Sequence, residues 1–407
     1  MGSFERLTLA EHTTVEKAVG ELNLSESVEY AQPNYLLYSL PISEGTVQSV
    51  LARSGSRGPC LLPGSRIPFG CDEAEYGDGT GSLGESDRPA LKVAPQAKFP
   101  PVVDPDLSQL WGMRKVQALE AWKIQPGSRQ VIVADIDTGI DYNHVDLAFN
   151  IWRNPNPTEK NDRVGFDFVH NDGLPFDDQE HGTHTAGTVG AVGGNGVGIS
   201  GVSQVVALMA LKFLAKDGSG TTADAIRAID YAIAHGAQVL SNSWGGQGDS
   251  DNRALREAIT RAQVKGVLFV AAAGNNSADN DVQGSASYPA AFQNDNLISV
   301  AATDEDDNLT YFSNYGKRTT HLAAPGSRIY STIPGDQYKQ MSGTSMACPH
   351  VAGAAALLWS QHPDWDYHKV KQVLLSTVDV IPGLSGKLVS GGRLNVFKAL
   401  QYADAQD

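Results

Sequence analysis

The sequence predicts an α/β fold in which a doubly wound, mainly parallel sheet carries helices on both faces. Two observations favour this fold. From Asp104 onward, short apolar runs of strand length alternate with longer amphipathic stretches. In addition, hydrophobic residues make up 41% of the 407 residues and charged residues 19%, so the chain can bury a large core.

The candidate strands and helices alternate along this part of the chain. We expect buried strands at residues 131–136, 205–213, 238–243, 267–272 and 297–302. We expect helices at residues 185–192, 222–234, 252–265, 345–361, 367–376 and 395–402. Residues 104–407 are therefore assigned to one globular domain.

Two further segments precede this domain. Residues 1–41 resemble a small α+β unit, with a strand at 4–9, a helix from 13 to 22 and a second strand or extended arm at 28–38. Residues 42–103 are rich in Gly, Pro and Ser and are predicted to be a linker. Cys60 and Cys71 both lie in this linker, and the sequence leaves open whether they form a disulfide.

The charge excludes several classes of function. With 31 basic and 46 acidic residues the net charge is −15, which argues against a nucleic-acid-binding protein and against a polybasic membrane-surface protein. The sequence has no apolar run of about 20 residues, so we expect no membrane span. No apolar signal-peptide region follows Met1, although the Met-Gly-Ser start leaves the native beginning open.

Five polar residues lie after strand candidates or near the start of helix candidates, where chemistry is often located in such sheets. Asp137 follows the first strand, Asn275 follows the fourth, and Ser345 lies at the start of a long apolar helix. His181 and His184 lie in a Gly-rich stretch and could be metal ligands, buried structural side chains or, for one of them, a general base. Each residue also has an ordinary structural explanation, such as a turn or a helix cap.

Taken together, these motifs resemble those of the subtilisin-like serine proteases (subtilases). The matching stretches occur in the family's order and are Asp137-Thr138-Gly139, His181-Gly182-Thr183-His184, Ala273-Gly274-Asn275 and Gly343-Thr344-Ser345-Met346-Ala347. The resemblance covers residues 104–403, and it implies a subtilisin-like fold and a serine endopeptidase that cleaves polypeptides through an acyl-enzyme.

The resemblance also implies the role of each catalytic residue. Ser345 is the expected nucleophile, His181 the base that accepts its proton, and Asp137 the residue that orients His181. Asn275 and the backbone N–H of Ser345 are expected to form the oxyanion hole. His184 is then structural, and Cys348 is expected to be a buried thiol and not a nucleophile.

The expected substrate-binding residues come from two segments that, in the family, flank an extended peptide as additional strands. They are Ser243, Trp244, Gly245 and Gly246 on one side and Gly218 on the other, with Ala273 and Gly274 as a further wall. The glycines leave an apolar, roomy pocket, so we expect a preference for a large aliphatic or aromatic side chain before the scissile bond.

The glycine-rich stretch at 192–199 has two interpretations. Gly196, Gly198 and Gly201 match a dinucleotide fingerprint, but a helix precedes them and a strand follows, the reverse of what phosphate binding needs. The family resemblance implies a calcium (Ca²⁺) loop instead. The implied oxygen ligands are Asp104, Asp141, Val192, Asn195, Val197 and Ile199.

The N-terminal segment resembles the end of a subtilase propeptide, with a strand-like arm at 35–40 that could lie in the cleft as substrate does. We therefore expect a secreted or extracytoplasmic, monomeric and autoprocessed zymogen whose own N-terminal segment is an intramolecular inhibitor, although the sequence does not identify the processing site. A catalytically silent, subtilase-like binding module is one alternative, and a nucleotide-dependent oxidoreductase that uses the glycine loop is another.

Overall fold

A computed structural model describes residues 7, 15–23, 28, 30–32, 34–40, 103–158, 160–247 and 252–405. The chain divides into two units, one formed by residues 1–44 and 101–407 and the other by residues 45–100. Only the first unit contains described residues, so the predicted linker up to residue 102, its cysteine pair and the predicted strand at 4–9, apart from Leu7, lie outside them.

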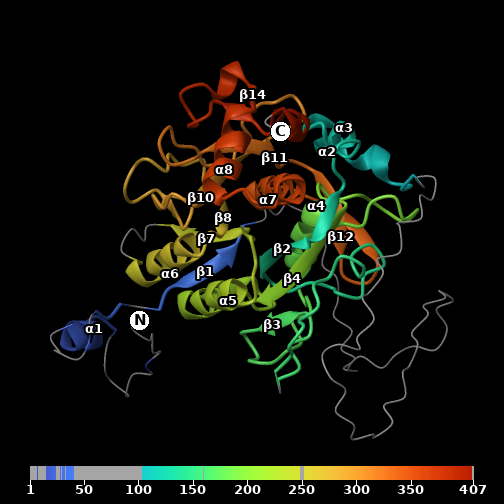
Figure 1. Cartoon of the computed structure of the whole chain (residues 1–407). Helices are drawn as coiled ribbons and strands as arrows, with labels where there is room; N and C mark the ends of the chain where they lie inside the picture. The colour runs from blue at the N-terminus through green and yellow to red at the C-terminus, as the bar shows by residue number, and fades with distance from the viewer. Residues whose placement is uncertain are drawn as a thin grey trace, which may run out of the picture. The chain divides into compact units, whose positions relative to one another are not determined.

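A mainly parallel sheet lies at the centre of this unit and confirms the predicted fold class (Figure 1). All of its neighbouring pairs are parallel except β14 and β15, which are antiparallel. In spatial order the described strands are β14 (Asp379–Val380), β15 (Gly392–Arg393), β11 (Leu322–Pro325), β10 (Leu297–Thr303), β8 (Leu268–Ala272), β6 (Val239–Asn242), β2 (Gly127–Asp137), β4 (Val205–Lys212) and β3 (Gly165–Asp167).

Apolar side chains leave both faces of this sheet, because successive residues of a strand point to opposite faces. In β2, Val133 belongs to one core cluster and Ala134 to the other, and in β8 Val270 and Phe269 divide in the same way. One cluster includes side chains of α2 (Trp111–Lys115), α3 (Ala118–Ala121), α4 (His181–Gly190), α7 (Thr344–Gln361), α8 (Tyr367–Ser376) and α9 (Val396–Asp404). The other includes those of α5 (Thr222–Ala234) and α6 (Arg253–Val264), so the sheet is covered on both sides.

A second, smaller sheet was only partly expected. Its described strands are β5 (Ser219–Thr221), β1 (Leu36–Ser39), β7 (Trp244–Gln247) and β9 (Ser287–Tyr288), in that spatial order. Figure 1 shows β1, in blue, near α5 and α6 and far in sequence from the strands beside it. An antiparallel hairpin, β12 (Ile329–Ile333) and β13 (Gln337–Met341), was not predicted.

The predicted elements agree with the structure apart from their ends. The helix expected at residues 222–234 has those bounds, whereas the helix expected to begin at Thr185 begins at His181. In the N-terminal segment, α1 (Val15–Asn23) is present, and the arm forms a strand only over β1. Among the described residues, none of the helices has both the length and the apolar character needed to cross a bilayer.

Candidate active site

Asp137 and His181 form a buried acid–imidazole pair. Asp137 is the last residue of β2 and His181 the first of α4, and Asp137 Oδ1 lies 2.7 Å from His181 Nδ1. Both side chains are fully buried, and the backbone N–H of Thr138 also donates to Asp137 Oδ1 at 2.7 Å. Gly182 permits this approach, because a Cβ there would lie 2.1 Å from the carbonyl oxygen of Gly139. Among the described residues, His181 Nε2 is buried and has no hydrogen-bond partner.

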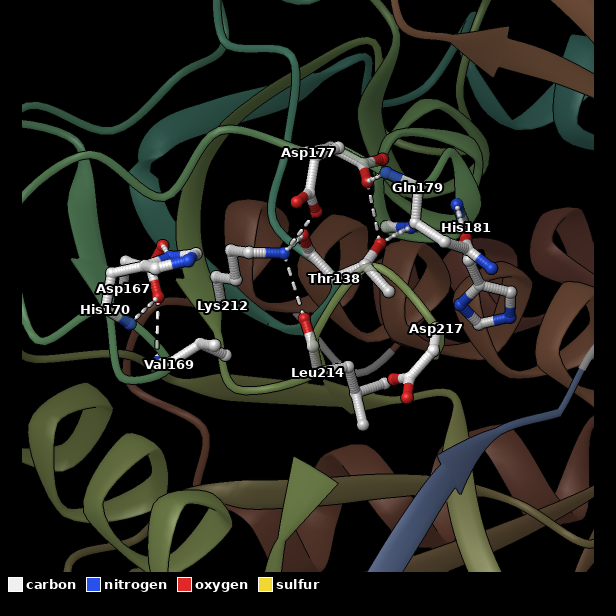
Figure 2. Close-up of polar contacts among 12 residues, drawn as sticks. Thr138, Asp167, Val169, His170, Asp177, Gln179, His181, Lys212, Leu214 and Asp217 are labelled. Carbon is white, nitrogen blue, oxygen red and sulfur yellow. Dashed lines mark hydrogen bonds and ion pairs between the residues drawn. The ribbon is translucent and has the colours of Figure 1, made fainter. Parts of the chain in front are cut away.

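A buried carboxylate, Asp177, explains why α4 begins early. Its Oδ1 accepts the backbone N–H groups of Gln179 and Glu180, and its Oδ2 accepts that of Thr183. These bonds satisfy donors that a helix leaves free at its N-terminus. Asp177 Oδ1 also accepts the hydroxyl of Thr138, next to Asp137 (Figure 2). Burial nevertheless raises the pKa of Asp177, so the network is maintained against a desolvation cost.

Lys212, the last residue of β4, joins three segments around this pair. Figure 2 shows its side chain extending toward Thr138, whose carbonyl oxygen accepts from Nζ at 2.7 Å. The same Nζ donates to the carbonyl oxygen of Leu214 at 2.9 Å and to Asp178 Oδ1 at 2.7 Å. Only 1% of the Lys212 side chain is exposed, so a buried cation ties the turn after Asp137 to the segments that lead to α4 and β5.

Ser345 lies in the first turn of α7, and its position depends on Ser243. Because Pro349 has no N–H, the carbonyl oxygen of Ser345 lacks its usual helical partner four residues later. The Ser243 hydroxyl donates to that oxygen at 2.9 Å, and the Ser345 hydroxyl donates to the Ser243 carbonyl oxygen at 2.9 Å. Among the described hydrogen bonds, none joins Ser345 Oγ to His181 Nε2. The structure therefore holds the hydroxyl on Ser243.

Two side chains near this site have structural surroundings. Cys348 is fully buried, and burial raises the pKa of its thiol to about 12, which is unsuited to a thiolate nucleophile. His184 Nε2 lies 3.0 Å from the carbonyl oxygen of Ile329, and burial and the neighbouring His181 lower its pKa to about 3. A neutral, enclosed imidazole agrees with the structural role expected for His184.

The Asn275 side chain is oriented by Thr344. Its Oδ1 accepts the backbone N–H and the hydroxyl of Thr344, each at 2.9 Å. The Nδ2 amide group therefore points away from Thr344, and it donates to the carbonyl oxygen of Leu40, the residue after β1. An amide fixed in this way is a preorganised donor for a carbonyl oxygen.

The strand β1 lies between β5 and β7 and pairs antiparallel with both. Beyond the ladder, the N–H of Ser39 donates to the Gly218 carbonyl oxygen at 2.9 Å, and the N–H of Leu40 donates to that of Ser243 at 3.3 Å. The Ser243 carbonyl oxygen thus accepts both Leu40 and the Ser345 hydroxyl. Residues 36–40 have the extended, edge-bound form of a recognised peptide.

Two glycines of β7 lie directly beside this segment. A Cβ on Gly245 would lie 3.6 Å from Leu40 Cδ1, and one on Gly246 would lie 3.7 Å from Leu37 Cδ2. Trp244, by contrast, is fully buried and packs at 4.9 Å between ring centroids against Phe213. Its backbone pairs with β1, whereas its indole belongs to the core cluster that Leu37 also joins.

The chain before β1 contacts the N-termini of two helices. The Gln32 side-chain oxygen accepts the backbone N–H of Ala254 at the start of α6, and that of Asn34 accepts the N–H of Ala223 at the start of α5, each at 2.9 Å. The Tyr30 hydroxyl donates to Glu257 at 2.9 Å. Free N–H groups at helix starts thus find partners in the N-terminal segment.

The expected calcium ligands are only partly brought together. Asp104 and Asp146 are buried beside the 192–199 loop, where Asp104 accepts the N–H groups of Gly194 and Gly196 and Asp146 accepts that of Ile199. The structure corrects the expected position of Asp141. Its carboxylate does not face the 192–199 loop but accepts the N–H groups of Asn143 and Gly335.

Asp146 takes the place expected for Asp141, and Asn195 Nδ2 donates to it at 2.8 Å. Burial raises the pKa of Asp146 to about 6, and the charge of Asp104 adds to this rise. Within the described ranges, no group of three His, Cys, Asp or Glu side chains could hold a metal ion. A cation here would need the loop's amide and carbonyl oxygens as well, and such an all-oxygen donor set suits Ca²⁺.

Comparison with known proteins identifies relatives. Residues 128–398 match the model of the subtilase family. The chain is 42% identical over 297 residues to thermitase of Thermoactinomyces vulgaris, covering 72% of this chain and 97% of that protein. It is 40% identical to a thermophilic serine proteinase of a Bacillus species (69% and 64% covered) and 38% identical to subtilisin Savinase of Lederbergia lenta (66% and 90% covered).

Proposed function

The chain belongs to the subtilase family and is a serine endopeptidase, and we propose that Asp137, His181 and Ser345 are its catalytic triad, with Asn275 in the oxyanion hole. One observation supports this assignment above all. A carbonyl group of an extended segment, that of Leu40, lies at the Asn275 amide while the same segment shares the Ser243 carbonyl oxygen with the Ser345 hydroxyl.

In this mechanism the Ser345 hydroxyl turns from Ser243 toward His181 Nε2, which has no hydrogen-bond partner in the structure. Ser345 Oγ then attacks the substrate carbonyl carbon, and its proton passes to Nε2. Asp137 holds the imidazole through Nδ1 and stabilises its cationic form. Asn275 and the N–H of Ser345 stabilise the oxyanion, and the imidazolium gives its proton to the leaving amine. Water later releases the acyl group.

Labelling and hydrolysis together test the nucleophile. Once the chain has been cut between residues 45 and 100 and diluted so that the N-terminal segment dissociates, it is expected to hydrolyse an unfolded protein and to be labelled by a fluorophosphonate. Ser345→Ala, treated in the same way, is expected to lose both. Cys348→Ala is the matched control, because it changes a second buried residue of α7 and should keep both properties. Labelling of a folded Ser345→Ala chain would refute the assignment. Absence of hydrolysis in all three folded chains would favour the catalytically silent binding module.

We further propose that the N-terminal segment inhibits the enzyme by occupying the cleft. Leu37 is 4% exposed and Leu40 half-buried, and the backbone of residues 36–40 lies between β5 and β7 as substrate would. Because a tethered segment has a high effective concentration, even a modest affinity is enough to keep the cleft filled.

Severing the tether tests this inhibition. A recognition site for a sequence-specific cysteine protease, inserted between residues 45 and 100, would convert the segment into a dissociable inhibitor. After cutting, the activity per molecule should rise as the protein is diluted, because the segment dissociates. Leu37→Asp weakens the binding of the segment, so its activity should rise already at a higher protein concentration. Leu36→Asp is the control, since that side chain is 56% exposed, and it should behave as the parent chain does. Equal activity before and after cutting would contradict the proposal.

We also propose that the 192–199 loop holds Ca²⁺ with Asp104, Asp146, Asn195 and the loop carbonyl oxygens at Val192, Val197 and Ile199. The ion would neutralise two buried carboxylates and so stabilise the fold. A ligand at about 100 times its Kd adds about 2.7 kcal/mol of stability. Chelation of the Ser345→Ala chain should therefore lower its Tm.

Substitution of Asp146 and of Asp141 distinguishes calcium binding at this loop from a general effect of salt on stability. Asp146→Asn should abolish the difference in Tm between calcium and chelator, whereas Asp141→Asn should keep it. A chelator effect that survives in Asp146→Asn would contradict the ligand set.

Two further proposals concern the setting of the enzyme. We propose that it acts on polypeptides outside the cytoplasm and as a monomer, on the family relationship. Light scattering of the Ser345→Ala chain at increasing concentration tests the second proposal, and a concentration-dependent mass would refute it.

A further inference from the structure

The structure identifies one peptide bond that the N-terminal segment presents to the candidate catalytic groups. The carbonyl oxygen of Leu40 accepts from Asn275, and the N–H of Leu40 donates to the Ser243 carbonyl oxygen on which the Ser345 hydroxyl lies. The carbonyl carbon of Leu40 is therefore the one in position for attack. The nitrogen on its other side belongs to Pro41.

Proline changes the chemistry of this bond. Cleavage requires Ser345 Oγ to bond to the Leu40 carbonyl carbon, with its proton passing to His181 Nε2. The carbon–nitrogen bond then breaks as that proton moves to the leaving nitrogen. In an X–Pro bond this nitrogen carries a ring methylene where other residues carry hydrogen. The leaving nitrogen therefore has no hydrogen of its own and is bulkier than that of other residues, although it must receive its proton from the fully buried His181.

The same proline favours binding. A residue before proline is restricted to extended backbone, which is the form of the segment that ends at Leu40. Preorganisation of this kind lowers the entropy lost when a peptide becomes a strand in a cleft. Position 41 therefore promotes occupation of the cleft and hinders the reaction there.

We propose that Leu40–Pro41 is a bond that the enzyme binds but does not cut, so that residues 36–40 are a resistant internal inhibitor. This inference rests on the proposed function of the site and of the segment. It means that the full chain does not mature by cutting at the bond in its own cleft. Release of the segment depends on cleavage at another bond of the chain.

A single substitution tests the inference in the full chain. Pro41→Ala restores an ordinary secondary amide, and the purified chain should then be cut after Leu40, with the introduced alanine as the new N-terminus. Misplacement of reacting groups by about 1 Å costs roughly 100-fold in rate, so cleavage at this bond should be at least about 100-fold faster than in the wild type. The rate should not depend on enzyme concentration, because the bond is presented within one chain.

Two control variants separate the outcomes. Ile42→Ala changes the neighbouring residue and should leave the Leu40–Pro41 bond intact, and Pro41→Ala combined with Ser345→Ala should remain uncut. Wild-type cleavage after Leu40 would overturn the inference, as would a Pro41→Ala chain that stays intact after Leu40 while it hydrolyses an added leucyl peptide substrate. If neither chain hydrolyses the added substrate once its tether has been cut and the sample diluted, the proposed function fails as well.

Discussion

Glu180, directly before His181, has a backbone that suits glycine. Its φ is 137° and its ψ −21°, a conformation that a residue with a Cβ adopts only under strain. Strain of this kind costs about 1–3 kcal/mol. We therefore expect Glu180→Gly to stabilise the fold. Glycine also gives the unfolded chain more conformational freedom, and this opposes the gain.

Two opposing effects reduce the gain. The additional freedom of glycine in the unfolded state costs about 0.4–1 kcal/mol. The substitution also removes the ion pair between Glu180 Oε1 and Lys339 Nζ, which are 2.6 Å apart. The two side chains are 29% and 48% exposed, so solvent screening limits this pair to about 0–1 kcal/mol. A net stabilisation of about 1 kcal/mol remains, or about 2 °C in Tm.

Denaturant unfolding of chains that carry Ser345→Ala, which prevents self-digestion, measures this gain. Glu180→Ala keeps the Cβ but loses the carboxylate, so it should be no more stable than the parent chain. Lys339→Ala isolates the ion pair. If Glu180→Gly were no more stable than Glu180→Ala, the backbone before His181 would not be strained and the reasoning would be refuted. In chains with Ser345, Glu180→Gly should leave kcat/KM unchanged, because His181 keeps its bond to Asp137.

Four other predictions concern single residues. Asn275→Ala should lower kcat by about 100- to 1,000-fold with little change in KM, and steady-state kinetics showing only a higher KM would contradict this. Gly245→Val should reduce kcat/KM for leucyl substrates more than for alanyl ones, because its Cβ would already contact a leucine Cδ1 at 3.6 Å and its two methyl groups add bulk there, and an unchanged ratio would refute it. Burial lowers the pKa of His321 to about 3, so the folded chain loses stability as pH falls from 6.5 toward 3; in urea unfolding, His321→Asn should lose about 2 kcal/mol less than the wild type between pH 7 and pH 5, and equal losses would contradict this. Lys212→Met should cost about 3 kcal/mol in the same assay because it strands buried acceptors, and a neutral effect would show that Lys212 does not hold these segments together.

Local patterns were sufficient to predict most of the sheet and its helices. The strand of residues 267–272 is a continuous apolar run because both of its faces are covered, and α5 has a Thr cap and a clear apolar periodicity. The beginning of α4 was missed for a physical reason. Its first N–H groups are satisfied by Asp177, a side chain outside the helix, and helix propensity does not include such a contact.

The loop at residues 192–199 and the segment around Trp244 show a second limit. Asp141 and Asp146 both follow Asp137 closely, and only the folded turn decides which carboxylate faces the loop. Trp244 lies in a segment that lines the cleft, but its own side chain points into the core, since neighbouring residues of a strand face opposite ways. Sequence position locates such segments, whereas the direction of each side chain depends on register.

Ser243 connects the N-terminal segment with the proposed nucleophile in a way that motif matching does not reveal. Its carbonyl oxygen accepts both the Leu40 N–H and the Ser345 hydroxyl, and its own hydroxyl satisfies the carbonyl that Pro349 leaves free. A carbonyl oxygen has two lone pairs, so both acceptor positions are used while the segment is bound. The hydroxyl then rests on Ser243, and His181 Nε2 has no partner. The Asp137–His181 bond of 2.7 Å is thus present while residues 36–40 lie between β5 and β7, and in the proposed mechanism it is the Ser345 side chain that must turn toward His181.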